Sequence, residues 1–214
     1  MRVLVMTKYP QPGKVKTRLA RTLGPERACR LHEAFLLDLR DRLRQARLPV
    51  TWAVWPPDAD VGTLLPGETI VPQEGADLGE RMDRAATRVA NGSRETVVVL
   101  GTDVPHVPLA WVRRAAGEIE WGRDVVLGPA RDGGYYLVAY RPPCPALFAD
   151  VPWGSAGVLA TTVARCGAAG LGLGLLPQLF DVDVGADLES LRGWCRTRPG
   201  MLPRTRLLLE ESTG

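Results

Sequence analysis

The run Thr96-Val97-Val98-Val99-Leu100 is followed directly by Gly101-Thr102-Asp103-Val104-Pro105, and this stretch decides the fold. An apolar, β-branched run without a polar interruption predicts a strand buried on both faces, which is typical of a parallel sheet. In open α/β sheets, ligands bind at the carboxyl ends of such strands. Asp103 stands at that end and is a candidate ligand for a hard cation such as Mg²⁺, which prefers oxygen donors. The alternative is that Asp103 caps the following helix.

The composition fits a single globular α/β domain. The chain has 214 residues, 45% of them hydrophobic, and a formal net charge of +3. No apolar stretch approaches the ~20 residues that cross a bilayer, and the apolar start is too short for a signal peptide. The four cysteines are scattered, which argues against a zinc site or a disulfide scaffold. We therefore expect a cytoplasmic protein that binds neither membrane nor nucleic acid.

Strand signals alternate with helical ones, which predicts a three-layer α/β domain. The predicted strands are 2–6, 51–55, 70–71, 96–100, 124–128, 135–140 and 173–176, and the predicted helices are 25–47, 78–90, 109–120, 156–166 and 187–196. Only a tight turn separates 124–128 from 135–140, so the sheet should be mixed, mostly parallel with one antiparallel excursion. In helix 25–47, Asp38 is the one polar break in the apolar period. We expect one domain over 1–200 and a tail over 201–214 that is disordered or packs on a partner subunit.

A basic loop, Lys8–Leu19, follows the first strand. Phosphates are bound by backbone amides in loops shaped by Gly and Pro, by helix starts, and by Lys or Arg side chains, and this loop offers all three. It matches neither a P-loop nor a dinucleotide fingerprint. The loop residues that we select as candidates for phosphate binding are Lys8, Pro12, Gly13, Lys14, Lys16, Thr17 and Arg18. The alternative is a solvated basic loop; in either case we expect it to be too polar to form core.

Two further segments carry candidate ligand-binding residues. In the first, Asp77 and Glu80 are explained as a helix cap, which leaves Gln73 and Arg81 available for a phosphate or a nucleobase carbonyl. In the second, Asp132-Gly133-Gly134-Tyr135 is a hairpin signal in its own right. The glycine pair would also allow a ligand to approach the backbone closely, and a tyrosine can stack on a sugar or base.

A last segment, Phe180-Asp181-Val182-Asp183, predicts a short strand with carboxylates on one side. One of the two carboxylates is a candidate second oxygen ligand beside Asp103, and Asp187 is predicted to cap the following helix. Of the two histidines, we interpret His32 as structural. His106, next to Asp103, either touches a ligand or is a solvated loop residue.

Taken together and in order, these segments resemble the glycosyltransferase-A-like (GT-A-like) "transferase 1, rSAM/selenodomain-associated" family, often labelled an arsenosugar-biosynthesis glycosyltransferase. Its wider superfamily includes nucleotidyltransferases such as phospholactate guanylyltransferase, whose early motif is similar to Lys16-Thr17-Arg18-Leu19. The resemblance implies a Rossmann-like α/β/α nucleotide-diphospho-sugar transferase fold with a mixed, mostly parallel sheet. Two segments depart from the family pattern, Trp153-Gly154-Ser155 and Val184-Gly185, and both lose hydroxyls near the expected cleft.

The resemblance implies a transferase that acts on a nucleotide and depends on Mg²⁺ (or Mn²⁺). Asp103, Lys16 and Arg18 form the catalytic set, and Asp103 with Asp183 holds the metal, with Asp132 as the alternative second ligand. Besides the loop residues, the nucleotide-binding set contains Gln73, Gly79, Arg81 and Thr102. The substrate-binding set contains Asp132, Gly133, Gly134, Tyr135 and Trp153.

The basic loop favours nucleotidyl transfer from a nucleoside triphosphate to a small phosphorylated acceptor. Pyrophosphate leaves in that reaction, so it needs more positive charge than glycosyl transfer from a nucleotide-sugar. Glycosyl transfer is the first alternative, and a non-catalytic nucleotide-binding module is the second. The expected partners are a nucleotide or nucleotide-sugar and a small-molecule acceptor; a homodimer is left open.

Overall fold

The structure, a computed structural model, describes residues 1–92 and 94–211. The strands are β1 (Arg2–Lys8), β2 (Val50–Trp55), β3 (Thr69–Pro72), β4 (Val97–Gly101), β5 (Val125–Pro129), β6 (Tyr135–Tyr140) and β7 (Leu173–Leu175). The helices are α1 (Thr17–Leu23), α2 (Pro25–Gln45), α3 (Leu78–Ala90), α4 (Leu109–Glu120), α5 (Pro145–Phe148), α6 (Val158–Ala168), α7 (Gly185–Arg196) and α8 (Pro203–Glu210). In the described part of the chain no helix is both long and apolar enough to span a bilayer.

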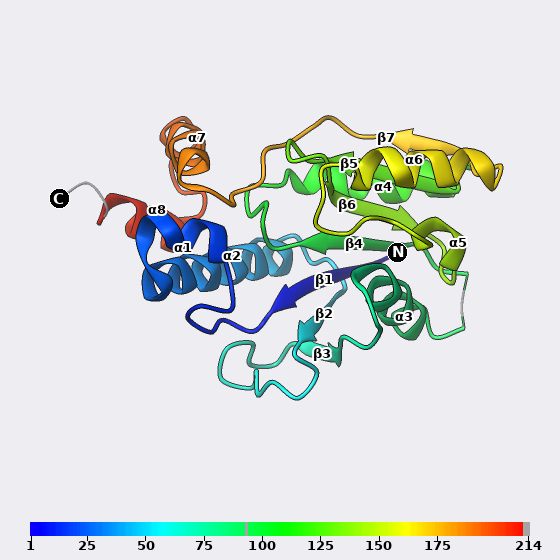
Figure 1. The fold of residues 1–214 in the computed structure, drawn as a ribbon. Coiled ribbons are helices and arrows are strands. Elements are labelled where there is room, and N and C mark those ends of the chain that lie inside the picture. Colours follow the sequence, from blue (N-terminus) through cyan, green and yellow to red (C-terminus); the bar gives the residue numbers. More distant parts are fainter. Residues whose placement is uncertain (93, 212–214) are drawn as a thin grey trace.

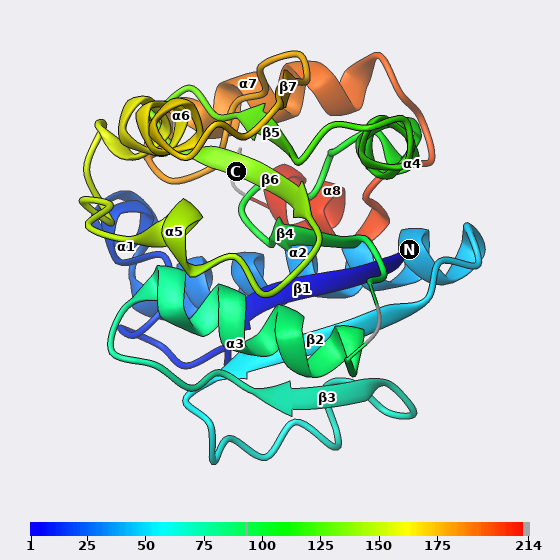
Figure 2. The same cartoon turned by 90° about the vertical axis from the view of Figure 1, so that its right-hand side faces the viewer.

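The strands form one seven-stranded sheet in the order β3-β2-β1-β4-β6-β5-β7, which Figure 2 shows from β3 at the bottom to β7 at the top. Strand β6 runs antiparallel to β4 and β5, and the other neighbours are parallel. The mixed sheet predicted from the tight turn is confirmed. The predicted three-layer fold is confirmed as well.

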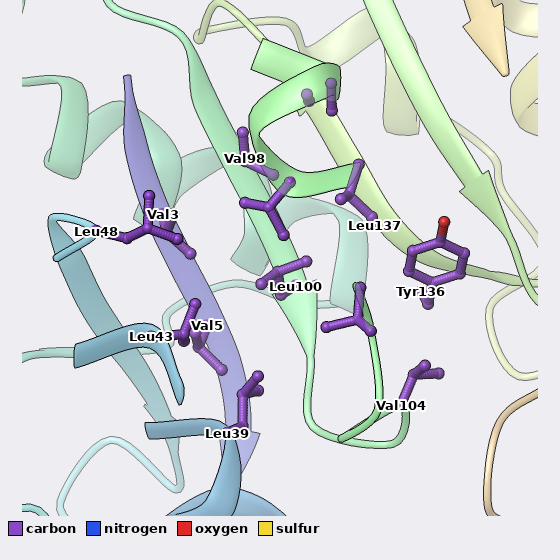
Figure 3. Packing of buried hydrophobic residues seen from close by; sticks show 14 of the residues in the cluster. Val3, Val5, Leu39, Leu43, Leu48, Val98, Leu100, Val104, Tyr136 and Leu137 are labelled. Carbon is purple, nitrogen blue, oxygen red and sulfur yellow. The ribbon is translucent and has the colours of Figure 1, made fainter. Parts of the chain in front are cut away.

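Alternate residues of the inner strands point into two separate hydrophobic cores, one on each face of the sheet. Val3 and Val5 of β1 face α2 and α4 in one cluster, whereas Leu4 and Met6 face α3, α5 and α6 in the other. Figure 3 shows the first cluster, with Leu39 of α2 close to β1. Because both faces of a central strand are covered, its sequence is a continuous apolar run rather than an alternating one.

A third core lies beyond the carboxyl edge of the sheet, where α1, α7 and α8 pack with the first half of α2. Figure 1 shows this group to the left of the strand arrowheads. Helix α8 corrects our expectation of a disordered or partner-bound tail for residues 201–211, which pack within this core, whereas 212–214 lie outside the described residues. The carboxylate of Asp38, 0% exposed, accepts hydrogen bonds from the backbone N–H groups of Arg204 (3.2 Å) and Thr205 (2.9 Å). The polar break in helix α2 is therefore the cap of α8.

Candidate active site

A cleft of about 340 Å³ opens at the carboxyl ends of β1 and β4. Of the predicted site residues, it is lined by Lys8, Lys16, Thr17, Arg18, Gln73, Arg81, Thr102, Asp103 and Asp183. They come from four segments of the chain: the basic loop, the segment with Gln73 and Arg81, the end of β4, and the segment around Asp183. The sheet brings them together because parallel strands end on one edge.

Lys16 is the centre of this constellation. Its ammonium forms an ion pair with the carboxylate of Asp103 and lies 3.0 Å from Oδ1 of Asp183. It also donates a hydrogen bond to the carbonyl oxygen of Val182 at 2.7 Å. The Lys16 side chain is 3% exposed, so our expectation that the basic loop contributes nothing to the core is wrong here and at Val15, which is also buried.

Burial and charge act in opposite directions on this pair. Taken alone, burial lowers the pKa of Lys16, and the protein packed around Asp103, although its side chain is 52% exposed, raises the pKa of that carboxyl. The attraction between the two groups, helped at Lys16 by Asp183, outweighs burial, so the pKa of Lys16 is raised and that of Asp103 lowered. Both groups are charged at neutral pH. Helix α4 begins at Leu109 after Pro108, so the alternative that Asp103 caps a helix is wrong.

Asp183, and not Asp181, is the second carboxylate in the cleft. The segment around Val182 is not a strand of the sheet, contrary to our expectation. Instead the Val182 N–H donates to the carbonyl oxygen of Asp103 at 3.0 Å, which aligns Asp183 with Lys16. Asp187 accepts hydrogen bonds from the N–H groups of Asp183 and Val184, both at 2.8 Å, and caps α7 as predicted.

The opposite wall of the cleft holds a rigid cation. The guanidinium of Arg81 stacks over the Trp55 ring at 3.8 Å, and its Nε–H donates to the carbonyl oxygen of Gly75 at 3.1 Å. Among the described residues, its terminal nitrogens form no hydrogen bond or ion pair. The amide nitrogen of Gln73 donates hydrogen bonds to the carbonyl oxygens of Thr7 (2.9 Å) and Ala53 (2.8 Å). This side chain therefore holds the ends of β1 and β2 together rather than donating to a ligand.

Sequence reasoning missed seven residues that line the cleft, and two of them, His32 and Trp55, have polar or aromatic side chains that bear on the site. His32 comes from α2, and its Nε2–H donates to the carbonyl oxygen of Lys8 at 2.9 Å. Burial lowers the pKa of this imidazole, so the ring is neutral. His32 therefore has the structural role that we predicted, and it also lines the cleft. No local signal marks either residue, because α2 packing and the end of β2 bring them to the site.

Several predicted site residues do not line the cleft. Pro12, Gly13 and Lys14 lie in the exposed or half-exposed part of the basic loop. Asp132, which we offered as an alternative metal ligand, accepts the N–H of Gly134 at 2.8 Å within the β5–β6 turn. That turn is the hairpin that the Asp-Gly-Gly signal predicts. The roles of Pro12, Gly13 and Lys14 in phosphate binding, and of Asp132 in substrate binding, stay predictions.

Trp153 and Tyr135 form an aromatic wall behind α3. Their rings meet edge to face at 6.3 Å. A Cβ at Gly79 would lie 2.7 Å from Cζ2 of Trp153, so Gly79 lets α3 approach this wall closely. Asp77 caps α3 as predicted, with its Oδ1 accepting the Glu80 N–H at 2.8 Å. These contacts pack the start of α3 against the aromatic pair, and neither Tyr135 nor Trp153 lines the cleft.

His106 is neither solvated nor in the cleft, which corrects both of our expectations for it. It is 1% exposed and stacks on Phe180 at 4.1 Å, and neither ring nitrogen has a hydrogen-bond partner in the part of the chain that the structure describes. Burial, with the nearby Arg42, Arg198 and Arg131, lowers the pKa of His106 to about 3. The α7 region covers this loop, which the sequence alone did not indicate.

This burial predicts an acid-sensitive fold. The unfolded chain binds a proton at His106 below about pH 6.5, whereas the folded chain does so only near pH 3. The contribution of His106 to the free energy of unfolding is therefore fully present above pH 6.5 and is lost as the pH falls toward 3. The free energy of unfolding falls by up to about 1.4 kcal/mol per pH unit because of this group. We expect His106→Phe, which keeps a stacked ring, to flatten that slope in urea titrations between pH 6 and pH 4. Parallel slopes for the two proteins would contradict this assignment.

Two carboxylates close enough to share one ammonium fit a Mg²⁺ ion that keeps most of its water and takes further oxygens from phosphates. They do not fit a cation that needs a complete protein cage. Within the described residues, no group of three or more His, Cys, Asp or Glu side chains is placed to hold a metal. The ammonium of Lys16 stands between the two candidate ligands.

Comparisons with known proteins define the family. The chain belongs to the family described as "Uncharacterized protein conserved in bacteria (DUF2064)", whose model matches residues 37–155, more than half of the sequence. The match includes Asp103 and the β5–β6 hairpin and begins after the basic loop. No curated protein matches the sequence.

Solved structures extend the likeness over the whole chain. A protein from Desulfovibrio desulfuricans G20, provisionally named a nucleotide-diphospho-sugar transferase, shares 32% identity at a TM-score of 0.87, covering 99% of this chain and 98% of its own. A cytidylyltransferase from Leptospira borgpetersenii serovar Hardjo-bovis has 12% identity and a TM-score of 0.58, over 98% and 92% of the two chains. A CMP:2-keto-3-deoxy-manno-octonic acid synthetase bound to CTP has 13% identity and a TM-score of 0.57, over 92% and 98%. The last two show the fold alone.

Proposed function

We propose that this protein is a nucleotide-dependent transferase that moves a nucleotidyl group from a nucleoside triphosphate to a small phosphorylated acceptor. One observation carries the proposal. Four cationic side chains, Lys8, Lys16, Arg18 and Arg81, line the same cleft as the carboxylates of Asp103 and Asp183. The name of the relative at 32% identity, a nucleotide-diphospho-sugar transferase, supports a nucleotide-linked substrate.

The cleft residues suit this chemistry because phosphoryl chemistry needs positioning and charge neutralisation more than covalent help from the protein. An oxygen of the acceptor phosphate attacks the α-phosphorus, and the bond to the departing pyrophosphate breaks. We assign Lys8 and Arg18, which line the cleft, the neutralisation of that pyrophosphate. Arg81, held flat on Trp55, offers two N–H groups in a fixed fork to a phosphate or base acceptor.

Asp103 and Asp183 are the residues that would hold Mg²⁺, which supplies charge neutralisation on phosphate oxygens when bound. Asp103 is the more accessible of the two, with its side chain 52% exposed against 28% for Asp183. It also lies directly after β4, whose backbone is fixed on both sides by pairing. We therefore assign Asp103 the leading role and Asp183 a supporting one.

Glycosyl transfer from a nucleotide-sugar is the second candidate, favoured by the name of the relative at 32% identity. The two reactions differ in their leaving group. A nucleotidyltransferase releases pyrophosphate, and a glycosyltransferase releases a nucleoside diphosphate. The basic cleft favours the first because pyrophosphate carries the more concentrated charge. A module that binds nucleotides without chemistry would do neither.

The deciding experiment incubates the protein with each nucleoside triphosphate, Mg²⁺ and a pool of phosphorylated acceptors. Pyrophosphate release that depends on the acceptor supports nucleotidyl transfer. Turnover of nucleotide-sugars without pyrophosphate overturns it in favour of glycosyl transfer. A thermal-shift screen of the same ligands, with and without Mg²⁺, identifies the base, because a ligand that binds only the folded state raises its stability. Ligand binding without turnover would favour the second alternative, a nucleotide-binding module that has no catalytic activity.

Arg18→Ala is the variant that tests the phosphate assignment. Its side chain is 61% exposed and 3.7 Å from Asp183, so we expect the free energy of unfolding to change by less than about 0.5 kcal/mol. Triphosphate binding should weaken by about 1–2 kcal/mol, the scale of one charge-assisted contact, and nucleoside binding should not change. Calorimetric titration measures both affinities.

Arg21→Ala is the matched control, because Arg21 is an exposed arginine of the same helix that does not line the cleft. It should bind the triphosphate as tightly as the parent. Equal losses for nucleoside and triphosphate in Arg18→Ala would mean that the variant disturbs the fold. Unchanged triphosphate affinity would make Arg18 a solvated surface residue.

A further inference from the structure

The ammonium of Lys16 has no hydrogen-bonding capacity to spare. It has three N–H donors, and three acceptors surround it: the Asp103 carboxylate, Oδ1 of Asp183 at 3.0 Å and the Val182 carbonyl oxygen at 2.7 Å. With its side chain 3% exposed, Lys16 is a satisfied, internal group. An exposed lysine that binds phosphate would instead have N–H groups free to donate to the ligand.

The backbone of Lys16 is also committed to this position. It adopts φ 46° and ψ 43°, the left-handed region, directly before the first residue of α1. A residue with a Cβ adopts that conformation at a cost and keeps it only where surrounding contacts determine it. The three acceptors of the ammonium provide such contacts, and they come from two segments far away in the sequence, at Asp103 and at Val182–Asp183.

Lys16 therefore fills the place between the two carboxylates that would hold a divalent cation. We propose that Lys16 is the resident cation of this site, and that its ammonium and a divalent cation compete for the Asp103–Asp183 pair. A bound polyphosphate offers Lys16 other acceptors, so the divalent cation binds well only together with the anionic substrate. The inference rests on the proposed function for its biological meaning, although the competition itself needs no nucleotide.

The test uses Mn²⁺ alone, with free Mn²⁺ measured by its electron paramagnetic resonance signal and no nucleotide present. Removing the positive charge beside both carboxylates should favour the dication, and we expect Lys16→Gln and Lys16→Met to bind Mn²⁺ at least about tenfold more tightly than the parent. Lys16→Arg, which keeps the charge, is the matched control and should show no gain. Asp183→Asn added to Lys16→Gln should abolish the gain.

Should the uncharged variants fail to fold, the unaltered protein provides a second readout. An amine-acylating reagent should leave Lys16 unmodified in the absence of a divalent cation and modify it at saturating Mn²⁺, as followed by mass spectrometry of tryptic peptides. Folded variants whose Mn²⁺ affinity is unchanged or weaker would overturn the proposal. So would a Lys16 that stays unmodified after Mn²⁺ has bound.

These outcomes are separate from the test of the proposed function. Tighter Mn²⁺ binding in Lys16→Gln without any transferase activity would keep the competition and reject nucleotidyl transfer. Acceptor-dependent pyrophosphate release by the parent, with no gain in Mn²⁺ binding in Lys16→Gln, would keep nucleotidyl transfer and reject the competition.

Discussion

Asp103→Asn should reduce the transfer rate by ~10² or more while leaving the fold intact. The substitution keeps the shape of the side chain and an oxygen acceptor for Lys16, but it removes the charge that a divalent cation requires. Asp103 is half exposed in a loop, and the strand before it is held by β1 and β6, so little packing depends on the carboxylate. The rate is measured at saturating Mg²⁺ with the substrates that the screen identifies.

Asp150→Asn is the matched control for this variant. Asp150 is an exposed carboxylate that also pairs with a cation, Arg165, at 2.6 Å, and it does not line the cleft. It should retain full activity. Parent-like turnover of Asp103→Asn would reject the metal assignment and leave Asp103 as the ion-pair partner of Lys16 only.

Asp103 also shows what the sequence is able to predict. The apolar run before it is local and uninterrupted, so the strand, its burial on both faces and the position of its carboxyl end all follow from about ten residues. Asp77 and Asp187 were predicted as helix caps for the same reason, since a cap is a contact between residues three or four apart.

What could not be predicted depends on contacts between distant segments. Helix α1 was missed because it begins at Thr17, directly after a left-handed Lys16 whose conformation is fixed by Asp103 and Asp183. Helix α8 was missed because its cap is Asp38, in α2. The sequence showed an unexplained polar residue on an apolar helix face, which was the one available sign that something docks there.

The site was predicted as a set of residues and not as an arrangement. Lys16 and Asp183 were both selected, but with opposite partners: Lys16 for phosphate and Asp183 for metal. In the structure they bind each other, because the segment around Val182 crosses the edge of the sheet and pairs with Asp103. Charge pattern along the chain identifies candidate groups that come to line the cleft, whereas their partners depend on how the C-terminal segment returns to the sheet.

Gly133→Ala should lower the free energy of unfolding by about 3 kcal/mol or more, for two reasons that add. Gly133 has a positive φ of 90°, which costs a residue with a Cβ about 1–3 kcal/mol. The new Cβ would also overlap the carbonyl oxygen of Ala156 and lie 2.8 Å from its Cα. Backbone atoms cannot move aside cheaply, so overpacking adds roughly 1–3 kcal/mol. Urea denaturation measures the loss.

Gly170→Ala separates the two causes. Gly170 has a φ of 66°, and nothing lies within 4 Å of the position where its Cβ would stand. This variant should lose only the conformational contribution, about 1 kcal/mol. The difference between the two variants then reports the contact between the β5–β6 turn and Ala156, where the Gly133 carbonyl oxygen also accepts the Leu159 N–H at 2.8 Å. Equal losses would mean that the turn moves away from Ala156 without cost, and that its contact with the start of α6 does not contribute to the free energy of unfolding.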